Sequence, residues 1–164
     1  MIFFIESIVL CLIFTLMIVP KTRKDPLSQV YSYPTKIIER VKSLPEYEGK
    51  VPTNQKKWAT KIIASILFVI FLGTVTYLSG MKTFYHGFWY SYGLWMVVNW
   101  YDVIVLDVIL FCHDQHYRLK GTEDMVKEYE SPWFHVIGGL KGCVIGFIVC
   151  ILAAAFVMLL NVSL

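Results

Sequence analysis

The chain has 164 residues, of which 57% are hydrophobic and 16% are charged, and its formal net charge is +3. Soluble domains typically contain about 25% charged residues, and a soluble protein this apolar could not cover its core with polar surface. The composition therefore excludes an ordinary water-soluble domain, and the length suggests a single domain. The apolar residues are collected in long blocks, which is typical of membrane-spanning helices.

Four apolar blocks are each long enough to cross a bilayer as a helix, because a hydrocarbon core of about 30 Å requires about 20 helical residues. They lie at about 1–19, 58–79, 84–112 and 133–160. The blocks are too long for barrel strands and lack sustained polar alternation. We therefore predict an all-α integral membrane protein, a four-transmembrane-helix bundle whose loops lie at about 20–57 and 113–132.

The first block differs from a secretory signal peptide, because its basic cluster follows the apolar core and no small-residue cleavage site comes after it. That cluster consists of Lys21, Arg23 and Lys24. We expect a retained anchor whose N-terminus lies outside. Glu6 lies near enough to the start of the block for its carboxylate to reach the outer headgroups and remain solvated.

Lysine and arginine are concentrated in the loops: nine of the 15 lie in the first predicted loop and three in the second. The positive-inside rule places both loops in the cytoplasm and both termini on the other side of the cell membrane. Trp58 and Trp133 mark the inner ends of their blocks. Topology thus explains the basic residues, so we expect the lipid bilayer as partner, with a homo-oligomer or a membrane protein as further options, and no nucleic acid.

The first loop contains a short helix bounded by Pro34 and Pro45. Its apolar stripe and the basic residues beside it are Ile37, Ile38, Val41, Leu44, Lys36, Arg40 and Lys42. We predict an amphipathic interfacial helix on the inner membrane surface, and a soluble partner docked on the same stripe is the alternative. In the second loop we predict a solvated connector in which Lys127 pairs with Glu123 or Asp124.

The third block carries Asn99, Asp102 and Asp107 among apolar residues. A charged side chain at mid-bilayer costs about 2.5–3.5 kcal/mol on insertion scales, and such residues commonly line functional sites. In an α-helix Asp102 and Asp107 would lie about 140° apart around the axis, whereas Asn99 would lie within about 60° of Asp102. We predict a ligand- or ion-binding site at these three residues, with a purely structural lock between helices as the alternative.

Histidines gather where the third block ends and the fourth begins: His113, Asp114 and His116 lie close together, and His135 follows. These side chains could bind a transition metal or act in acid–base chemistry near neutral pH. Their spacing is not HExxH, and no catalytic glutamate lies between them, so a plain interfacial role stays open. The sequence leaves any cofactor unknown.

Small residues recur every four positions in the fourth block, a pattern that lets helix backbones approach closely. They are Gly138, Gly142, Gly146, Cys150 and Ala154. The partner of this seam is either another helix of the chain or a second copy. Lys141, beside the seam, either extends to the inner surface or pairs with Asp107.

No P-loop, nucleophile elbow or dinucleotide fingerprint occurs in the sequence, so no reaction is indicated. The intramembrane acids favour a small polytopic membrane protein with a polar site that handles a proton, a cation or a small ligand, as in transport. One alternative is an accessory or interaction subunit of a membrane complex. Another is a membrane enzyme with a His/Asp site at the cytoplasmic interface.

Overall fold

The computed structural model describes residues 1–52 and 54–163, with side chains described at all of these positions except 54–58, 60 and 61. The protein is all-helical, as predicted, with 82% of its residues in helices and no strand in the described part. The long elements are α1 (Ile2–Lys24), α3 (Asn54–Leu78), α4 (Phe84–Tyr101) continued by the π-helix η3 (Asp102–Phe111), and α6 (Pro132–Ser163).

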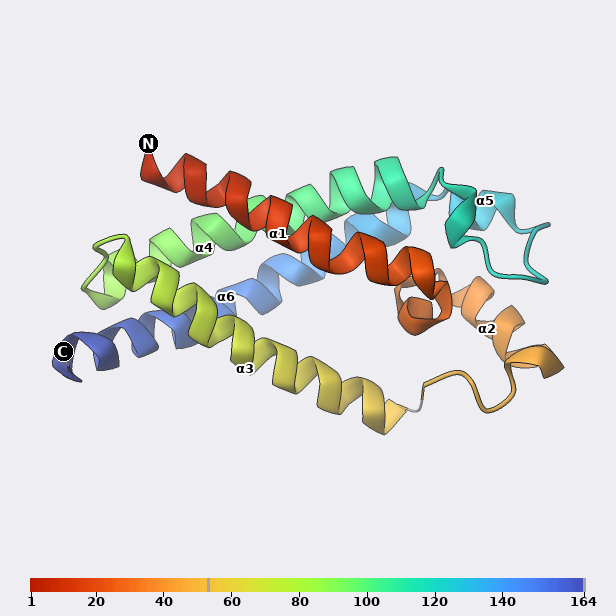
Figure 1. The fold of residues 1–164 in the computed structure, drawn as a ribbon, viewed down its shortest axis with the longest axis horizontal. Helices are drawn as coiled ribbons and strands as arrows, with labels where there is room; N and C mark the ends of the chain where they lie inside the picture. Colours follow the sequence, from red (N-terminus) through yellow and green to blue (C-terminus); the bar gives the residue numbers. More distant parts are fainter. Residues whose placement is uncertain (53, 164) are drawn as a thin grey trace.

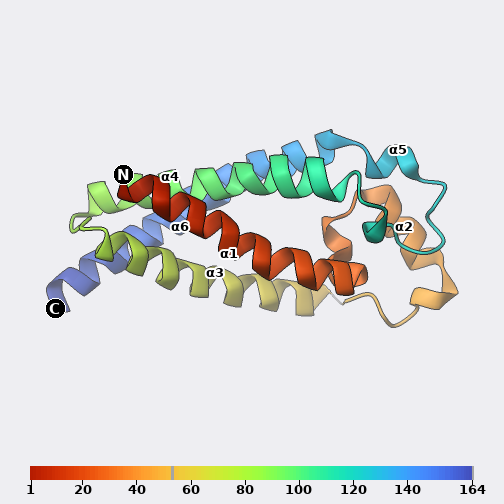
Figure 2. The same cartoon turned by 45° about the horizontal axis from the view of Figure 1, so that its top comes forward.

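The long helices run lengthwise beside one another (Figures 1 and 2). Helix α4 packs against α6, α3 packs against α6, and α1 packs against α4. Both chain ends and the α3–α4 turn lie at one end of the bundle, and α2 and α5 lie at the other end (Figure 1). The pair of α4 and α6 is therefore the centre of the fold, with α1 and α3 on its sides.

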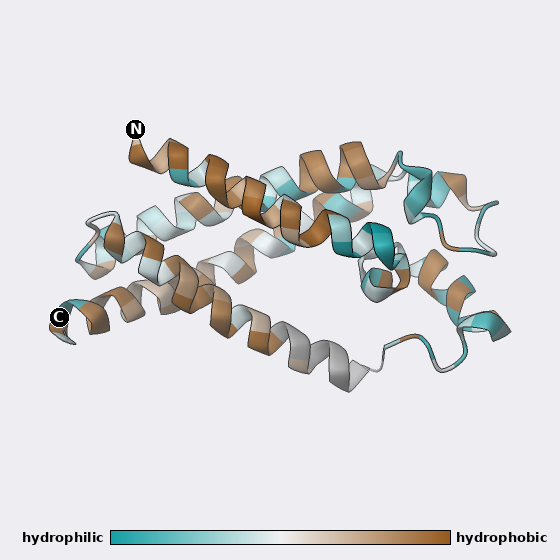
Figure 3. Cartoon of the chain, viewed as in Figure 1, coloured by the Kyte–Doolittle hydropathy of each residue, from teal (hydrophilic) through white to brown (hydrophobic). Residues whose placement is uncertain are grey.

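Three helical stretches are long and apolar enough to cross a membrane: Ile2–Lys24, Phe84–Phe111 and Val126–Ser163. The apolar colour of the long helices contrasts with the polar loops in Figure 3. Within the described residues, α3 contains a shorter apolar stretch, Ile62–Leu78. It falls in the predicted span 58–79, and the Trp58 side chain lies outside the described residues.

The two loops fold together instead of lying separately. They contain η1 (Pro26–Ser32), α2 (Thr35–Ser43), η2 (Pro45–Tyr47), η4 (Gln115–Tyr117) and α5 (Val126–Tyr129). A buried group of apolar residues, here called the loop cluster, joins them: Val30, Tyr33, Ile37, Val41, Leu119 and Tyr129. Two hydrogen bonds reinforce it, since the Tyr33 hydroxyl donates to the Tyr117 carbonyl at 2.7 Å and the Leu119 amide donates to the Tyr129 hydroxyl at 2.9 Å.

The loop cluster corrects two predictions. Ile37 and Val41 are fully buried against the second loop, so the apolar stripe of α2 is covered by protein and not by the membrane surface. The second loop is more than a solvated connector, because Tyr129 is buried in the same cluster. Asp124 pairs with Arg40 of α2 at 3.8 Å and not with its own neighbour in the loop. Such exposed pairs contribute about 0–1 kcal/mol, so burial of the apolar stripe is the main stabilising contact.

The contact between α4 and α6 depends on glycine. The Trp95 indole N–H donates to the Gly142 carbonyl at 3.0 Å, and the Asn99 amide donates to the Gly139 carbonyl at 3.1 Å. A Cβ at Gly146 would overlap the Trp95 ring. Two polar side chains of α4 thus lie directly on the backbone of α6, which only residues without a side chain allow. The partner of the small-residue seam is therefore α4 of the same chain.

The position of the seam differs from the predicted one at its first member. Gly138 is exposed and a Cβ there would meet nothing within 4 Å, whereas Gly139 is buried against Val103. A strict four-residue spacing drifts around an α-helix by about 40° per step, so a straight neighbour contacts positions that alternate by three and four. Gly139, Gly142 and Gly146 follow that alternation, and the buried residues Cys150 and Ala154 continue the contact face.

We predict that Gly146→Ala lowers the free energy of unfolding by about 1–3 kcal/mol, the usual cost of overpacking, because the new methyl group displaces the Trp95 ring from its hydrogen bond. Thermal unfolding of the full chain in detergent micelles measures the effect. Gly138→Ala is the matched control and should be neutral or slightly stabilising, because its surroundings are open and alanine favours helix. Equal melting temperatures for the two variants would contradict the proposed contact.

Candidate functional site

The two intramembrane aspartates lie in a π-helix. Segment η3 spans Asp102–Phe111, and at its end the Cys112 amide donates to the Asp107 carbonyl at 2.9 Å. Backbone hydrogen bonds in a π-helix join residues five apart, so such residues lie over one another on successive turns. The expected separation of about 140° between Asp102 and Asp107 is therefore wrong. Five of the ten residues in η3 are β-branched. Because such side chains crowd the preceding turn of an ordinary α-helix, this composition favours the wider turn of a π-helix.

Asp102 lines two cavities. The first, here called the lateral cavity, has a volume of about 300 Å³ and lies between α1, α3 and α4. The second, here called the loop-side cavity, has a volume of about 160 Å³ and extends toward the loops past Thr22 and Gln29. Asp107 lines the loop-side cavity only, and Phe14 lines both. Asp102 and Phe14 thus stand at the boundary between the two cavities.

The Asp102 carboxyl group has no hydrogen bond or ion pair with any part of the chain that the structure describes. A structural lock between helices would need such a partner, because a buried charge is costly unless it is paired. The unpartnered carboxyl group faces cavity space instead. This arrangement favours a role in binding.

Asp107 pairs with His135 and not with Lys141, the partner that the sequence suggested. Its Oδ2 lies 3.0 Å from Nδ1 of His135, whereas Lys141 is exposed on α6. His135 is 4% exposed, so it lies inside the bundle and not at a wet helix end. Its other ring nitrogen, Nε2, is buried without a hydrogen-bond partner among the described residues. The pair joins η3 to α6 beside the loop-side cavity.

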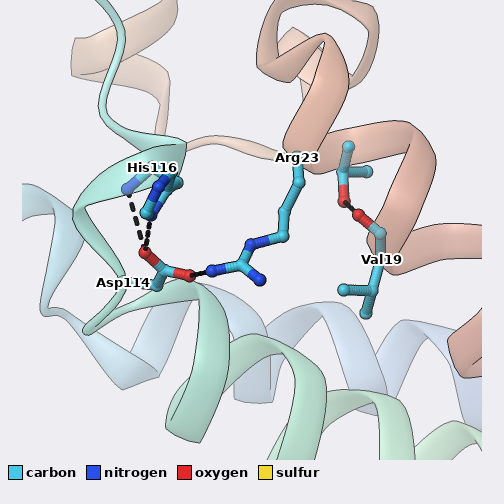
Figure 4. Close-up of polar contacts among 5 residues, drawn as sticks. Val19, Arg23, Asp114 and His116 are labelled. Atoms are coloured by element: carbon cyan, nitrogen blue, oxygen red, sulfur yellow. Dashed lines mark hydrogen bonds and ion pairs between the residues drawn. The ribbon is translucent and has the colours of Figure 1, made fainter.

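The other predicted metal ligands, His113, Asp114 and His116, form contacts of their own. Figure 4 shows those of Asp114 and His116. The Asp114 carboxylate accepts a hydrogen bond from Arg23 at 2.9 Å and lies 2.7 Å from Nδ1 of His116. His113 contacts the Val108 carbonyl at 2.9 Å. No three His, Cys, Asp or Glu side chains converge on a metal position in the described residues. The structure therefore does not bring the predicted metal set together, and Arg23 supplies the positive charge at Asp114.

The Asn99 side chain holds α4 against α6. Its amide donates to the Gly139 carbonyl at 3.1 Å, while the side chain forms part of the wall of the lateral cavity. The sequence predicts that Asn99 supports ligand binding, and the structure shows that its N–H group holds α6. Its position beside Asp102 agrees with the α-helical geometry of the preceding turn.

Glu6 forms a contact that sequence reasoning missed. Its carboxylate accepts hydrogen bonds from the Ser79 hydroxyl at the end of α3 and from the Tyr90 hydroxyl of α4, the latter at 2.6 Å. The residue, which is partly exposed, therefore ties α1 to the α3–α4 hairpin. The one available signal was an acid inside an apolar block, which indicates a need for partners but does not identify them.

Comparisons of the chain with protein-family models, with curated proteins and with solved structures find no match in any of the three. The candidate site consists of the Asp102 carboxyl group, which has no partner in the described part of the chain, the Asp107–His135 pair and the two cavities around them.

We predict that Asp107 and His135 are energetically coupled. In a double-mutant cycle of Asp107→Asn and His135→Gln, the double variant should lose less stability than the sum of the single losses, by about 0.5–3 kcal/mol. Denaturation in mixed micelles gives the four stabilities. Glu6→Gln combined with His135→Gln is the control, and its effects should add, because Glu6 bonds to α3 and α4 at a separate site. Strict additivity of the Asp107–His135 cycle would show that the contact contributes nothing.

We predict an acid-dependent contribution from Asp114, whose pKa lies below its ordinary value because the His116 backbone N–H donates to the carboxylate, with Arg23 adding to the effect. A carboxyl group with a lower pKa in the folded chain stabilises it above the unfolded pKa of about 3.9, and this stability is lost as the pH falls through the folded pKa. Asp114→Asn should therefore lower the melting temperature at pH 7, and the difference from wild type should disappear near pH 2.

The control for this measurement is Asp124→Asn, which removes an exposed carboxylate from a longer ion pair with Arg40. It should change the melting temperature little at any pH. A difference between wild type and Asp114→Asn that is constant from pH 7 to pH 2 would contradict the assignment.

Proposed function

We propose that this protein is a small multi-pass membrane protein that binds and transfers a proton or a cation at Asp102. The observation that carries the proposal is the Asp102 carboxyl group, which has no hydrogen bond or ion pair with the described residues and lies at the boundary of two cavities. An intramembrane ionisable group that faces a cavity is typical of ion and proton pathways. The acceptor next along the path is Asp107, which lines the loop-side cavity and pairs with His135.

The proposed topology has four spans, with α3 as the fourth, both loops in the cytoplasm and both termini outside the cell membrane. Three apolar helices suggest membrane insertion. Helix α3 runs beside α6 and connects the loop end of the bundle to the opposite end (Figure 1). The basic residues of the loops favour the cytoplasmic side. On this topology the loop-side cavity faces the cytoplasm.

Two observations argue against the alternative functions, the accessory subunit and the membrane enzyme. The small-residue seam of α6 is filled by Trp95 and Asn99 of the same chain, so it does not offer an accessory subunit a free docking groove. The histidines that would serve a membrane enzyme are divided between separate contacts. An accessory role therefore has to use another face of the helices.

The test is proton entry into reconstituted vesicles that contain a pH-sensitive dye, driven by a potassium diffusion potential. We expect entry above that of empty vesicles for the wild type and none above background for Asp102→Asn, because asparagine keeps the size but not the ionisable group. The variant should fold and should be at least as stable as wild type, since a costly buried acid is removed. Repeating the measurement with sodium or potassium gradients identifies the transferred ion.

Glu6→Gln is the matched control, because it also replaces a carboxylate within an apolar helix but lies outside both cavities. It should retain proton entry. Wild-type vesicles that behave like empty ones toward protons, sodium and potassium, or an Asp102→Asn variant that is clearly less stable than wild type, would overturn the proposal and favour the accessory function.

A further inference from the structure

Aromatic side chains from three helices line the lateral cavity. Phe14 of α1, Phe68 of α3 and Trp95 of α4 all line it, together with Asp102. Phe68 and Trp95 meet edge to face, with ring centroids 5.3 Å apart. The volume of about 300 Å³ lies at the lower end of the range for small-molecule sites. The cavity therefore combines apolar surface with a single negative group.

The lining does not suit a bare inorganic cation. Hard cations need several oxygen ligands to replace their hydration shell, and among the described residues the oxygen-bearing side chains that line the cavity are Asp102, Asn99 and Ser65. The Asn99 amide faces α6, with its N–H donating to the Gly139 carbonyl and its oxygen beside Gly142. Aromatic faces, in contrast, attract organic ammonium groups and replace their weak hydration. The composition of the wall thus favours an organic ammonium group over a bare inorganic cation.

The opening of the cavity lies toward the apolar surface of the bundle. Ala64 and Ser65 of α3 line the cavity and are themselves exposed. Their neighbours Ile62 and Ile66 are 57% and 55% exposed, and Figure 3 shows this part of α3 in the colour of apolar residues. In a bilayer this surface meets hydrocarbon. A ligand that enters here must partition into the membrane, so its body must be apolar.

We propose that the lateral cavity binds an organic cation, an ammonium group on an apolar body, with the ammonium at Asp102 and the body against Phe14, Phe68 and Trp95. The inference rests on the proposed function and names its ligand class. A proton and the organic cation compete for the same carboxyl group, because only the ionised form attracts the ammonium. Binding should therefore weaken as the pH falls, which gives the site a means of exchanging one for the other.

The probe is radiolabelled benzyltrimethylammonium, titrated onto the full chain in detergent micelles, with unlabelled neopentylbenzene as the neutral molecule of the same shape. We expect saturable binding at one site per chain, and displacement by neopentylbenzene at least about tenfold weaker than by unlabelled benzyltrimethylammonium. Asp102→Asn should weaken binding at least about tenfold, which corresponds to the loss of a charge pair of modest strength. Glu6→Gln should bind as wild type does.

The aromatic wall is tested by Phe68→Leu, which keeps an apolar side chain of similar size but removes the ring. We expect a loss of about two- to thirtyfold in affinity, the range of a single cation–π contact. Phe4→Leu is the matched control, since Phe4 is 70% exposed on α1 and does not line the cavity. It should leave the affinity unchanged.

Equal displacement by the neutral molecule would overturn the inference and assign the cavity to a lipid chain. Unchanged binding in Asp102→Asn, or equal losses in Phe68→Leu and Phe4→Leu, would also overturn it. The vesicle measurement separates the two proposals. Asp102-dependent proton entry without probe binding leaves the proposed function standing and rejects the organic cation, whereas Asp102-dependent probe binding without ion entry supports the site and rejects transfer.

Discussion

The contact of α4 with the glycine backbone of α6 determines where the candidate site lies. Trp95 and Asn99 donate hydrogen bonds to two carbonyls of α6 that lie three residues apart, and both side chains fit only because no Cβ stands at Gly142 and Gly146. These two bonds fix the rotation of α4 about its axis. Asp102 follows Asn99 by one turn of the same helix, so the glycine contact also sets the direction of its carboxyl group toward the cavities.

The π-helix then changes what the two acids can do together. With α-helical turns, Asp107 would face away from Asp102, and each would need its own environment. The wider turns of η3 place both along the loop-side cavity, while the pair with His135 anchors Asp107 to α6. Asp107 is thereby held by a partner, whereas Asp102 has none among the residues that the structure describes. Asp107 is thus a positioning group, whereas Asp102 is a group able to bind.

The sequence predicted the features that follow from local composition and periodicity. The all-α fold, the apolar helices and the short helix after Pro34 all depend on residues close together in the chain. The π-helix, the loop cluster around Ile37 and the bonds of Glu6 depend on contacts between distant segments, so periodicity could not reveal them. Gly138 and Gly139 show the limit most clearly, because neighbouring glycines are equivalent in sequence and only the direction of α4 distinguishes them.

Helix α1 carries a side chain that lines both cavities. It is held to the bundle by Glu6 at one end and by the Arg23–Asp114 ion pair at the other, with one hydrogen bond between Thr15 and Tyr101 in between. Its Phe14 side chain lines both cavities, as Asp102 does. The Phe14 ring and the Asp102 side chain thus lie together at the boundary of the two cavities. The hydrogen bond between Thr15 and Tyr101, one residue from Phe14 in the chain, therefore holds that ring in place without touching the acid itself.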